Sequence, residues 1–305
     1  MPAIYASWQL SAWIAATLAG VTVVARATNH PLTRRLGAFA REFTVVVALF
    51  AVYQYCGHYA HIKAAGGFVH ARQIIDFERA LHLPGEAWVQ GLITPHPWAV
   101  RTVNAYYAAV HLTSMTGFIV WVWWRHGDFY PRVRNIVAVS TLSCLLVQMV
   151  PVAPPRMFPE LGFVDTALQY GQSVYGPNGT GIADQLAAMP SIHVLWAGII
   201  AYYAVRMSSS RWRWVLVAHF VVTVFVVVAS ANHWWLDGVV AIGILALVLA
   251  TFAAARTLRD RAARSGDDPP MVVQSVVVQS VVVQPPSAQP SAEQRHDSAR
   301  AASPP

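Results

Sequence analysis

Long apolar runs, separated by short polar stretches, are the main pattern along this chain of 305 residues. Seven runs are nearly free of charge and are about 17–25 residues long, the length at which a helix crosses a bilayer. They fall at about 4–25, 42–62, 102–124, 135–153, 191–207, 214–231 and 235–255. The pattern therefore predicts an all-α fold, a polytopic membrane helix bundle with seven spans.

Composition supports this prediction. Hydrophobic residues make up 56% of the chain and charged residues only 11%, whereas soluble domains carry about 25% charged residues. The first apolar run has no basic residue before it, since Arg26 is the first in the chain. We therefore interpret it as a retained span and not as a signal peptide. Cys56 and Cys144 both fall within expected spans and are predicted to be apolar core residues.

The formal net charge of +7 is distributed unevenly between the connecting segments. Basic residues gather after the first, third, fifth and seventh runs, which is the positive-inside pattern. This predicts a plasma-membrane protein with its N-terminus outside and its C-terminus in the cytoplasm, and no nucleic-acid partner. The residues concerned are Arg26, Arg34, Arg35, Arg41, Arg125, Arg132, Arg134, Arg206, Arg211, Arg213, Arg256, Arg259, Arg261 and Arg264.

The chain divides into three parts by composition. Residues 1–41 are expected to form an N-terminal transmembrane helix and a cytoplasmic loop, 42–265 a membrane-embedded domain, and 266–305 a disordered cytoplasmic tail. Within 63–101, Ile74, Phe77 and Leu81 have helical spacing, which predicts a short interfacial helix that we interpret as a connection without chemistry. The stretch "YGQSVYGPNGTG" near 170 is typical of a mobile cover or of a linker.

Three groups of polar residues interrupt the apolar pattern. Arg156 follows the fourth run, Ser191 and His193 open the fifth, and "ANHWWLD" with Asn232, His233 and Asp237 separates the sixth from the seventh. Polar residues at such positions are costly and are usually functional. The predicted topology places all three groups on the extracytoplasmic face, and it is derived from the basic residues of the loops, independently of the sequences of these groups.

Each group has chemistry suited to an anion. Arg156 offers a rigid fork for a phosphate, and Ser191 is expected to cap a helix whose N-terminus favours negative charge. His193 would lie in that first turn. His233 and Asp237 are four residues apart and share a face if the helix begins by His233. A carboxylate bonded to one imidazole nitrogen leaves the other free as a nucleophile or base.

Taken singly, these residues have structural interpretations: an arginine that reaches the headgroups, or a satisfied interfacial histidine. Their combination on one face favours a functional site. In the third run, Asn104, Tyr107 and His111 also face one way. They could contact a substrate headgroup or form a polar seam between helices, and both interpretations stay open.

The three motifs "PVAPPR", "MPSIHVLWA" and "ANHWWLD", with "YYAAVHLTSM" upstream, resemble the type 2 phosphatidic acid phosphatase superfamily over about 42–255. They are most similar to its inositol phosphorylceramide synthase branch. The resemblance implies a six-helix core preceded by one extra transmembrane helix. It also implies a metal-independent enzyme, without cofactor, that acts on a lipid or polyprenyl-linked phosphate through a phosphohistidine.

The resemblance also implies roles for individual residues. His233 would attack the phosphoryl group, Asp237 would orient it, and His193 would protonate the leaving group. Arg156 and Ser191 would hold the phosphate oxygens. We further expect Asn232, Tyr107 and His111 to bind substrate.

The chain departs from the phosphatase branch at three positions. Met149 stands where that branch has a lysine, Val227 where it has a second arginine, and Met157 where it has a proline. Two cations are therefore missing. A phosphodiester carries less charge than a phosphomonoester, so we hypothesise transfer of a phospho-headgroup such as phosphoinositol.

Three alternatives remain at this point. The first is a lipid phosphate phosphatase of the same superfamily. The second is a metalloenzyme that uses His193, His233 and Asp237 as a two-histidine, one-carboxylate site. The third is a transporter in which these residues relay protons, although the polar groups gather at one face and no internal repeat is visible. The sequence leaves the oligomeric state open.

Overall fold

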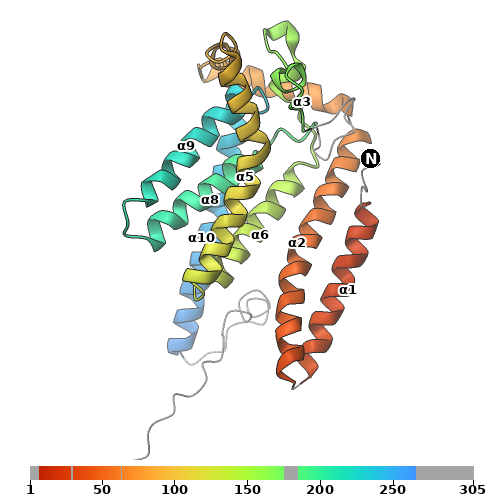
Figure 1. The fold of residues 1–305 in the computed structure, drawn as a ribbon, viewed down its shortest axis with the longest axis vertical. Helices are drawn as coiled ribbons and strands as arrows, with labels where there is room; N and C mark the ends of the chain where they lie inside the picture. The colour runs from red at the N-terminus through yellow and green to blue at the C-terminus, as the bar shows by residue number, and fades with distance from the viewer. Residues whose placement is uncertain (1–6, 29, 63, 175–184, 266–305) are drawn as a thin grey trace, which may run out of the picture.

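The computed structural model describes residues 7–28, 30–62, 64–174 and 185–265. At its N-terminal end, α1 (Trp8–Ala27) and α2 (Pro31–Ile62) form an antiparallel hairpin beside the other helices (Figure 1). A Cβ added at Gly37 would overlap the Cβ of Ala25, so glycine allows the close approach near the turn. Further along the hairpin, the Ser11 hydroxyl donates to Gln54 Oε1 at 2.7 Å.

Five helices form the main bundle: α5 (Pro97–Arg125), α6 (Tyr130–Val147), α8 (Ile192–Met207), α9 (Arg213–Ala229) and α10 (Trp235–Ser265). Their apolar side chains meet in one core, in which α8 is the most enclosed helix. A Cβ at Gly198 of α8 would lie 2.8 Å from Ile242 Cδ1, so this glycine lets α10 pack closely against α8.

Short elements cover one end of this bundle. Helices α3 (Ala64–Ala80) and α4 (Glu86–Gly91) lie there, with η1 (Pro155–Met157), η2 (Pro159–Leu161) and α7 (Thr166–Gln169) (Figure 1). They enclose a second, smaller core around Trp234, whose indole nitrogen donates to the Ala153 carbonyl at 2.9 Å. This cap holds the segments that carry the candidate site.

The all-α prediction is confirmed: the structure is 79% helical, and no strand occurs in its described part. Four helical segments are long and apolar enough to cross a membrane, namely Trp8–Ala27, Pro31–Tyr59, Pro97–Arg125 and Trp235–Ala263. The shorter helices α6, α8 and α9 lie at the other three expected spans. A membrane protein is therefore supported, while the number seven stays a prediction.

Several boundaries differ from those expected. Helix α2 begins at Pro31, so the expected division at 41/42 falls inside it. Helix α6 ends at Val147, short of residue 153, because the chain then turns to pair with a later segment: the Val152 N–H donates to the Leu186 carbonyl at 2.8 Å. Residues 175–184 of the glycine-rich stretch and the tail 266–305 lie outside the described residues.

Candidate functional site

His233 lies in the turn between α9 and α10. Ala231 takes a left-handed conformation (φ 54°) there, and the His233 N–H donates to the Val227 carbonyl at 3.2 Å. His233 Nδ1 is 2.7 Å from the Ala188 carbonyl oxygen and 3.3 Å from Asp237 Oδ2. Both atoms are acceptors, so Nδ1 carries the hydrogen. Nε2 is buried without a hydrogen-bond partner in the described part of the chain, and its lone pair is available.

Asp237 is completely buried and supports the turn as well as the histidine. Its Oδ2 accepts the Trp234 N–H at 2.8 Å in addition to facing His233. The expectation that His233 and Asp237 share a helix face required a helix that begins by His233. Helix α10 begins at Trp235, so the two residues meet because Asp237 reaches back across the helix start, as a capping side chain does.

Replacing Asp237 with asparagine should separate charge from geometry. An asparagine oxygen in the place of Oδ2 keeps both hydrogen bonds, and the Ala188 carbonyl still fixes the tautomer of His233. Only the negative charge is lost, which removes the charge-assisted part of one hydrogen bond. We expect kcat to fall roughly 10- to 100-fold with little change in melting temperature. A loss as large as that of His233→Ala would contradict this division of roles.

His193 lies in the first turn of α8, whose start is tied directly to α10. Ser191 caps α8 as predicted, accepting the Val194 N–H at 3.3 Å, and its own N–H donates to the Asp237 carbonyl at 3.1 Å. The rings of His193 and His233 are 5.7 Å apart between centroids. His193 Nε2 is also buried and has no hydrogen-bond partner among residues with described positions.

Helix α5 supplies the other side of the site. Tyr107 stacks on His193 at 4.2 Å between ring centroids, and His111 lies 4.0 Å from the same ring. Asn104 separates from this pair: it accepts a hydrogen bond from Thr166 Oγ1 at 3.2 Å and so holds α7 against α5. Of the three residues expected to face one way, two therefore reach the histidines and one has a structural contact.

Arg156 lies in η1 and is 6% exposed. Its Nη1 donates to Asn232 Oδ1 at 2.7 Å, its Nε is 3.4 Å from Asp165 Oδ2, and its backbone N–H donates to the Ala231 carbonyl at 2.9 Å. The segment that carries the arginine is thus attached to the turn that carries His233. The structure thus gathers His193, His233, Asp237, Ser191, Tyr107 and His111, and attaches Arg156 to their turn through Asn232 and Ala231; Asn104 lies apart.

Several supporting groups were missed. Gln148 donates from Nε2 to the Pro190 carbonyl at 3.0 Å and fixes the segment before α8; a glutamine inside an apolar run was a signal that could have indicated it. Asp165, the partner of Arg156, and the backbone carbonyl of Ala188 gave no signal, because their roles depend on contacts between distant segments.

Apolar residues occupy the two positions at which the phosphatase branch is expected to carry cations. Val227 is 2% exposed and packs in the main core, and Met149 is half-buried beside Gln148. Among the described residues, no group of three or more His, Cys, Asp or Glu side chains is arranged to hold a metal ion.

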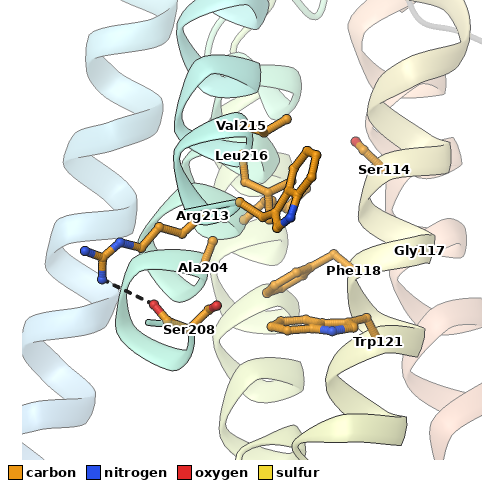
Figure 2. A pocket seen from close by; sticks show the side chains of 11 residues that line it. Ser114, Gly117, Phe118, Trp121, Ala204, Ser208, Arg213, Val215 and Leu216 are labelled. Atoms are coloured by element: carbon orange, nitrogen blue, oxygen red, sulfur yellow. Dashed lines mark hydrogen bonds between the residues drawn. The ribbon is translucent and has the colours of Figure 1, made fainter. Parts of the chain in front are cut away.

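A pocket of about 540 Å³ lies between α5, α8 and α9, in the part of the bundle away from the two histidines. It begins at Ser114, one helical turn beyond His111 on α5, and runs between α5, α8 and α9 toward the opposite end of the bundle. Phe118 and Trp121 face Leu216 across it, while Arg213 turns away to the Ser208 carbonyl (Figure 2). The residues that line it are mostly apolar, and none of them belongs to the site.

Four helices long and apolar enough to cross a membrane suggest a membrane protein, and two histidines, a carboxylate and an arginine gather at one end of its bundle. A family model of the PAP2 superfamily matches residues 72–253, and the chain belongs to this superfamily. Membership indicates a phosphatase or phosphotransferase type of function. The match begins within α3, so α1 and all of α2 precede it. Searches of the curated proteins and of the solved structures gave no match.

Proposed function

We propose that this protein is an integral membrane lipid phosphotransferase that works through a phosphohistidine on His233. The observation that carries the proposal is the state of that imidazole. Its Nδ1 is held by Ala188 and Asp237, and its Nε2 is buried and vacant beside His193. A nucleophile oriented by a carboxylate next to a second proton-transfer group is the arrangement that covalent catalysis needs.

The proposed reaction has two steps. His233 Nε2 forms a bond to phosphorus, the bond to the leaving oxygen breaks, and His193 gives that oxygen a proton. An acceptor hydroxyl or water then loses its proton to His193 and attacks phosphorus, which breaks the P–N bond and restores His233. Arg156, with Asn232 and the start of α8 at Ser191, would hold the phosphate oxygens.

The substrate we propose is a phosphodiester lipid whose headgroup, such as phosphoinositol, is transferred. Arg156 stands without the two further cations of the phosphatase branch, because Val227 and Met149 occupy those positions. A diester needs less positive charge than a monoester. The mostly apolar pocket that begins at Ser114, one turn after His111, supports a lipid substrate, since it offers space for part of an acyl chain.

Topology and environment complete the proposal. We infer seven spans, a six-helix core preceded by α1, with the site on the extracytoplasmic face and the C-terminus in the cytoplasm. The basic residues support this orientation: Arg125, Arg206 and Arg213 stand at the ends of α5, α8 and α9 that lie opposite the site. Labelling of single introduced cysteines from outside intact cells would test it.

A lipid panel tests the function. The purified protein is offered phosphatidylinositol and phosphatidic acid, each with and without a lipid alcohol as acceptor, in buffer and in EDTA. We expect headgroup transfer from phosphatidylinositol that requires the acceptor and persists in EDTA. Release of phosphate from phosphatidic acid at an equal rate would instead favour the phosphatase. Loss of all activity in EDTA, restored by a divalent metal, would favour the metalloenzyme.

A further inference from the structure

Two buried carboxyl groups outside the site contact the start of α10. Glu78 lies near the end of α3 and Glu86 opens α4, and both side chains are less than a tenth exposed. Glu78 Oε1 accepts the Leu236 N–H at 2.6 Å, and Glu86 Oε1 accepts the Trp235 N–H at 3.5 Å. The first N–H groups of a helix have no partner within it, so these glutamates satisfy them.

These two contacts hold the residues that lie between His233 and Asp237 in the chain. Trp235 and Leu236 stand between His233 and Asp237, so the glutamates hold the short segment that joins the proposed nucleophile to its orienting carboxylate. The Trp235 indole nitrogen also donates to the Pro84 carbonyl at 2.7 Å, which adds a contact from the α3–α4 connection. A shift of this segment would change the distance from Asp237 to His233.

The region carries more negative potential than it can hold fully ionised. In the described part of the chain, neither Glu78 nor Glu86 forms an ion pair. The titratable groups that face Glu78 are Glu86 on α4 and Asp237 on α10. Both neighbours raise the pKa of Glu78, because nearby negative charge disfavours its ionised form.

Glu78 is the carboxyl that keeps a proton. Burial, and next its hydrogen bond with Glu86, raise the pKa of Glu78 from 4.5 to about 9. At neutral pH this carboxyl is therefore neutral: it can donate to Glu86 while its other oxygen accepts the Leu236 N–H. Above about pH 9 the proton leaves, and two adjacent negative charges then repel each other and Asp237.

We propose that Glu78 and Glu86 are a positioning pair, which holds the first turn of α10 through the Leu236 and Trp235 N–H groups so that Asp237 stays aligned with His233. The pair acts through Trp235 and Leu236 and is not expected to touch substrate. The proposal rests on the proposed function of His233. It also replaces the interpretation of 63–101 as a connection without chemistry.

The same cap supports the arginine side of the site. Gln90, one turn after Glu86 on α4, makes two hydrogen bonds with the backbone of Val164, at 2.8 and 3.0 Å. Val164 directly precedes Asp165, the ion-pair partner of Arg156. Helix α4 therefore fixes the turn before α10 with one side chain and the segment that pairs with Arg156 with another.

The test compares two variants of Glu78 in the full-length protein, assayed with phosphatidylinositol or, if the wild type prefers it, phosphatidic acid. Glu78→Ala removes the acceptor and is expected to lower kcat about 10-fold or more with KM within about 2-fold. Glu78→Gln keeps an acceptor and a donor and should restore most of that loss. Asp76→Asn, an exposed carboxyl on the same helix, is the matched control and should match the wild type.

The pH profile gives a readout that a purely structural role would not move. Wild-type activity should fall as the pH rises through about 9, where Glu78 loses its proton, and Glu78→Gln should lack this fall. Stability follows the same sign. The folded state keeps a proton on Glu78 that the unfolded state releases above about pH 4.5, so the contribution of Glu78 to stability is lost as the pH rises from about 4.5 to about 9, and Glu78→Gln should lack this contribution.

Two outcomes would contradict the proposed positioning role: an unchanged kcat in Glu78→Ala, or a loss of activity above about pH 9 in Glu78→Gln that equals the loss in the wild type. Amide hydrogen exchange at Leu236 separates this failure from failure of the proposed function. If the wild type is inactive toward every lipid of the panel, the proposed function fails, and the proposal that the pair positions Asp237 for catalysis fails with it. Faster exchange at Leu236 in Glu78→Ala would then show only that the contact holds the helix start.

Discussion

Replacement of His233 by alanine is expected to abolish formation of a covalent phosphoenzyme and to lower turnover by at least about 10³-fold. The reason is that Nε2 is the atom that would bond to phosphorus, and no neighbouring nitrogen can take its place. His193 Nε2 belongs to a ring that stacks on Tyr107 and contacts the tilted ring of His111, and these two contacts fix its direction. The measurement is a brief reaction with a lipid radiolabelled in its phosphate, followed by denaturation and recovery of the protein.

Wild-type protein should retain label in an adduct that acid removes and base leaves intact, as a phosphohistidine does. His58→Ala is the control, because His58 is an exposed histidine on α2; it should label like the wild type. Equal labelling of His233→Ala and the wild type would contradict the proposed nucleophile. Melting temperatures of the three proteins distinguish loss of chemistry from loss of folding.

The residues of the site could be predicted because each breaks a strong local pattern. Arg156, His193, His233 and Asp237 are polar residues beside long apolar runs, and alternation of basic loops places them at one face. The apolar pattern also predicted where the long helices lie, and Ser191 caps α8 as the sequence indicates. A membrane chain reveals such residues well, because the cost of placing them near the bilayer makes each one conspicuous.

The supporting contacts could not be predicted, because they join segments far apart in the chain. Nothing near Ala188 indicates that its carbonyl lies 2.7 Å from His233, 45 residues later. Glu78 is even further from its partner Leu236, 158 residues away. Local spacing was also misleading at Asn104, where helical periodicity groups it with Tyr107 and His111 but the contact with Thr166 decides its role.

These differences have a common cause. The histidines lie at the starts of α8 and α10, where regular hydrogen bonding has not begun and free N–H groups remain. Such helix starts are useful for holding an anion, but they need outside contacts to fix their position. The cap of α3, α4 and the segment 151–165 supplies these contacts, and α1 and α2 pack elsewhere. The candidate site thus lies at one end of the bundle and is held there by the short segments of the cap.

Replacement of Arg156 should have the second largest effect. Its guanidinium donates to Asn232 and lies against Asp165, so the orientation of the guanidinium plane is fixed before substrate binds. Arg156 is also the one arginine or lysine in the three sequence motifs. We expect Arg156→Ala to lower kcat/KM by roughly 10²- to 10³-fold. In Arg156→Lys, a single ammonium cannot reproduce the planar fork, so the loss should be intermediate. Rates with the preferred panel lipid provide the measurement.

Arg72→Ala is the matched control, since Arg72 lies on α3 at the same end of the protein but is exposed and only 3.8 Å from Glu160 in a surface pair. It should retain wild-type kcat/KM. The charge of the substrate adds a second comparison. If one cation suffices because the substrate is a diester, Val227→Arg in the wild type should leave transfer from phosphatidylinositol unimproved, and its melting temperature shows whether an arginine at this buried position still lets the protein fold. If Val227→Arg instead produces phosphate release from phosphatidic acid, the absence of a second cation is what prevents monoester hydrolysis in the wild type. The hypothesis of a diester substrate would then be wrong.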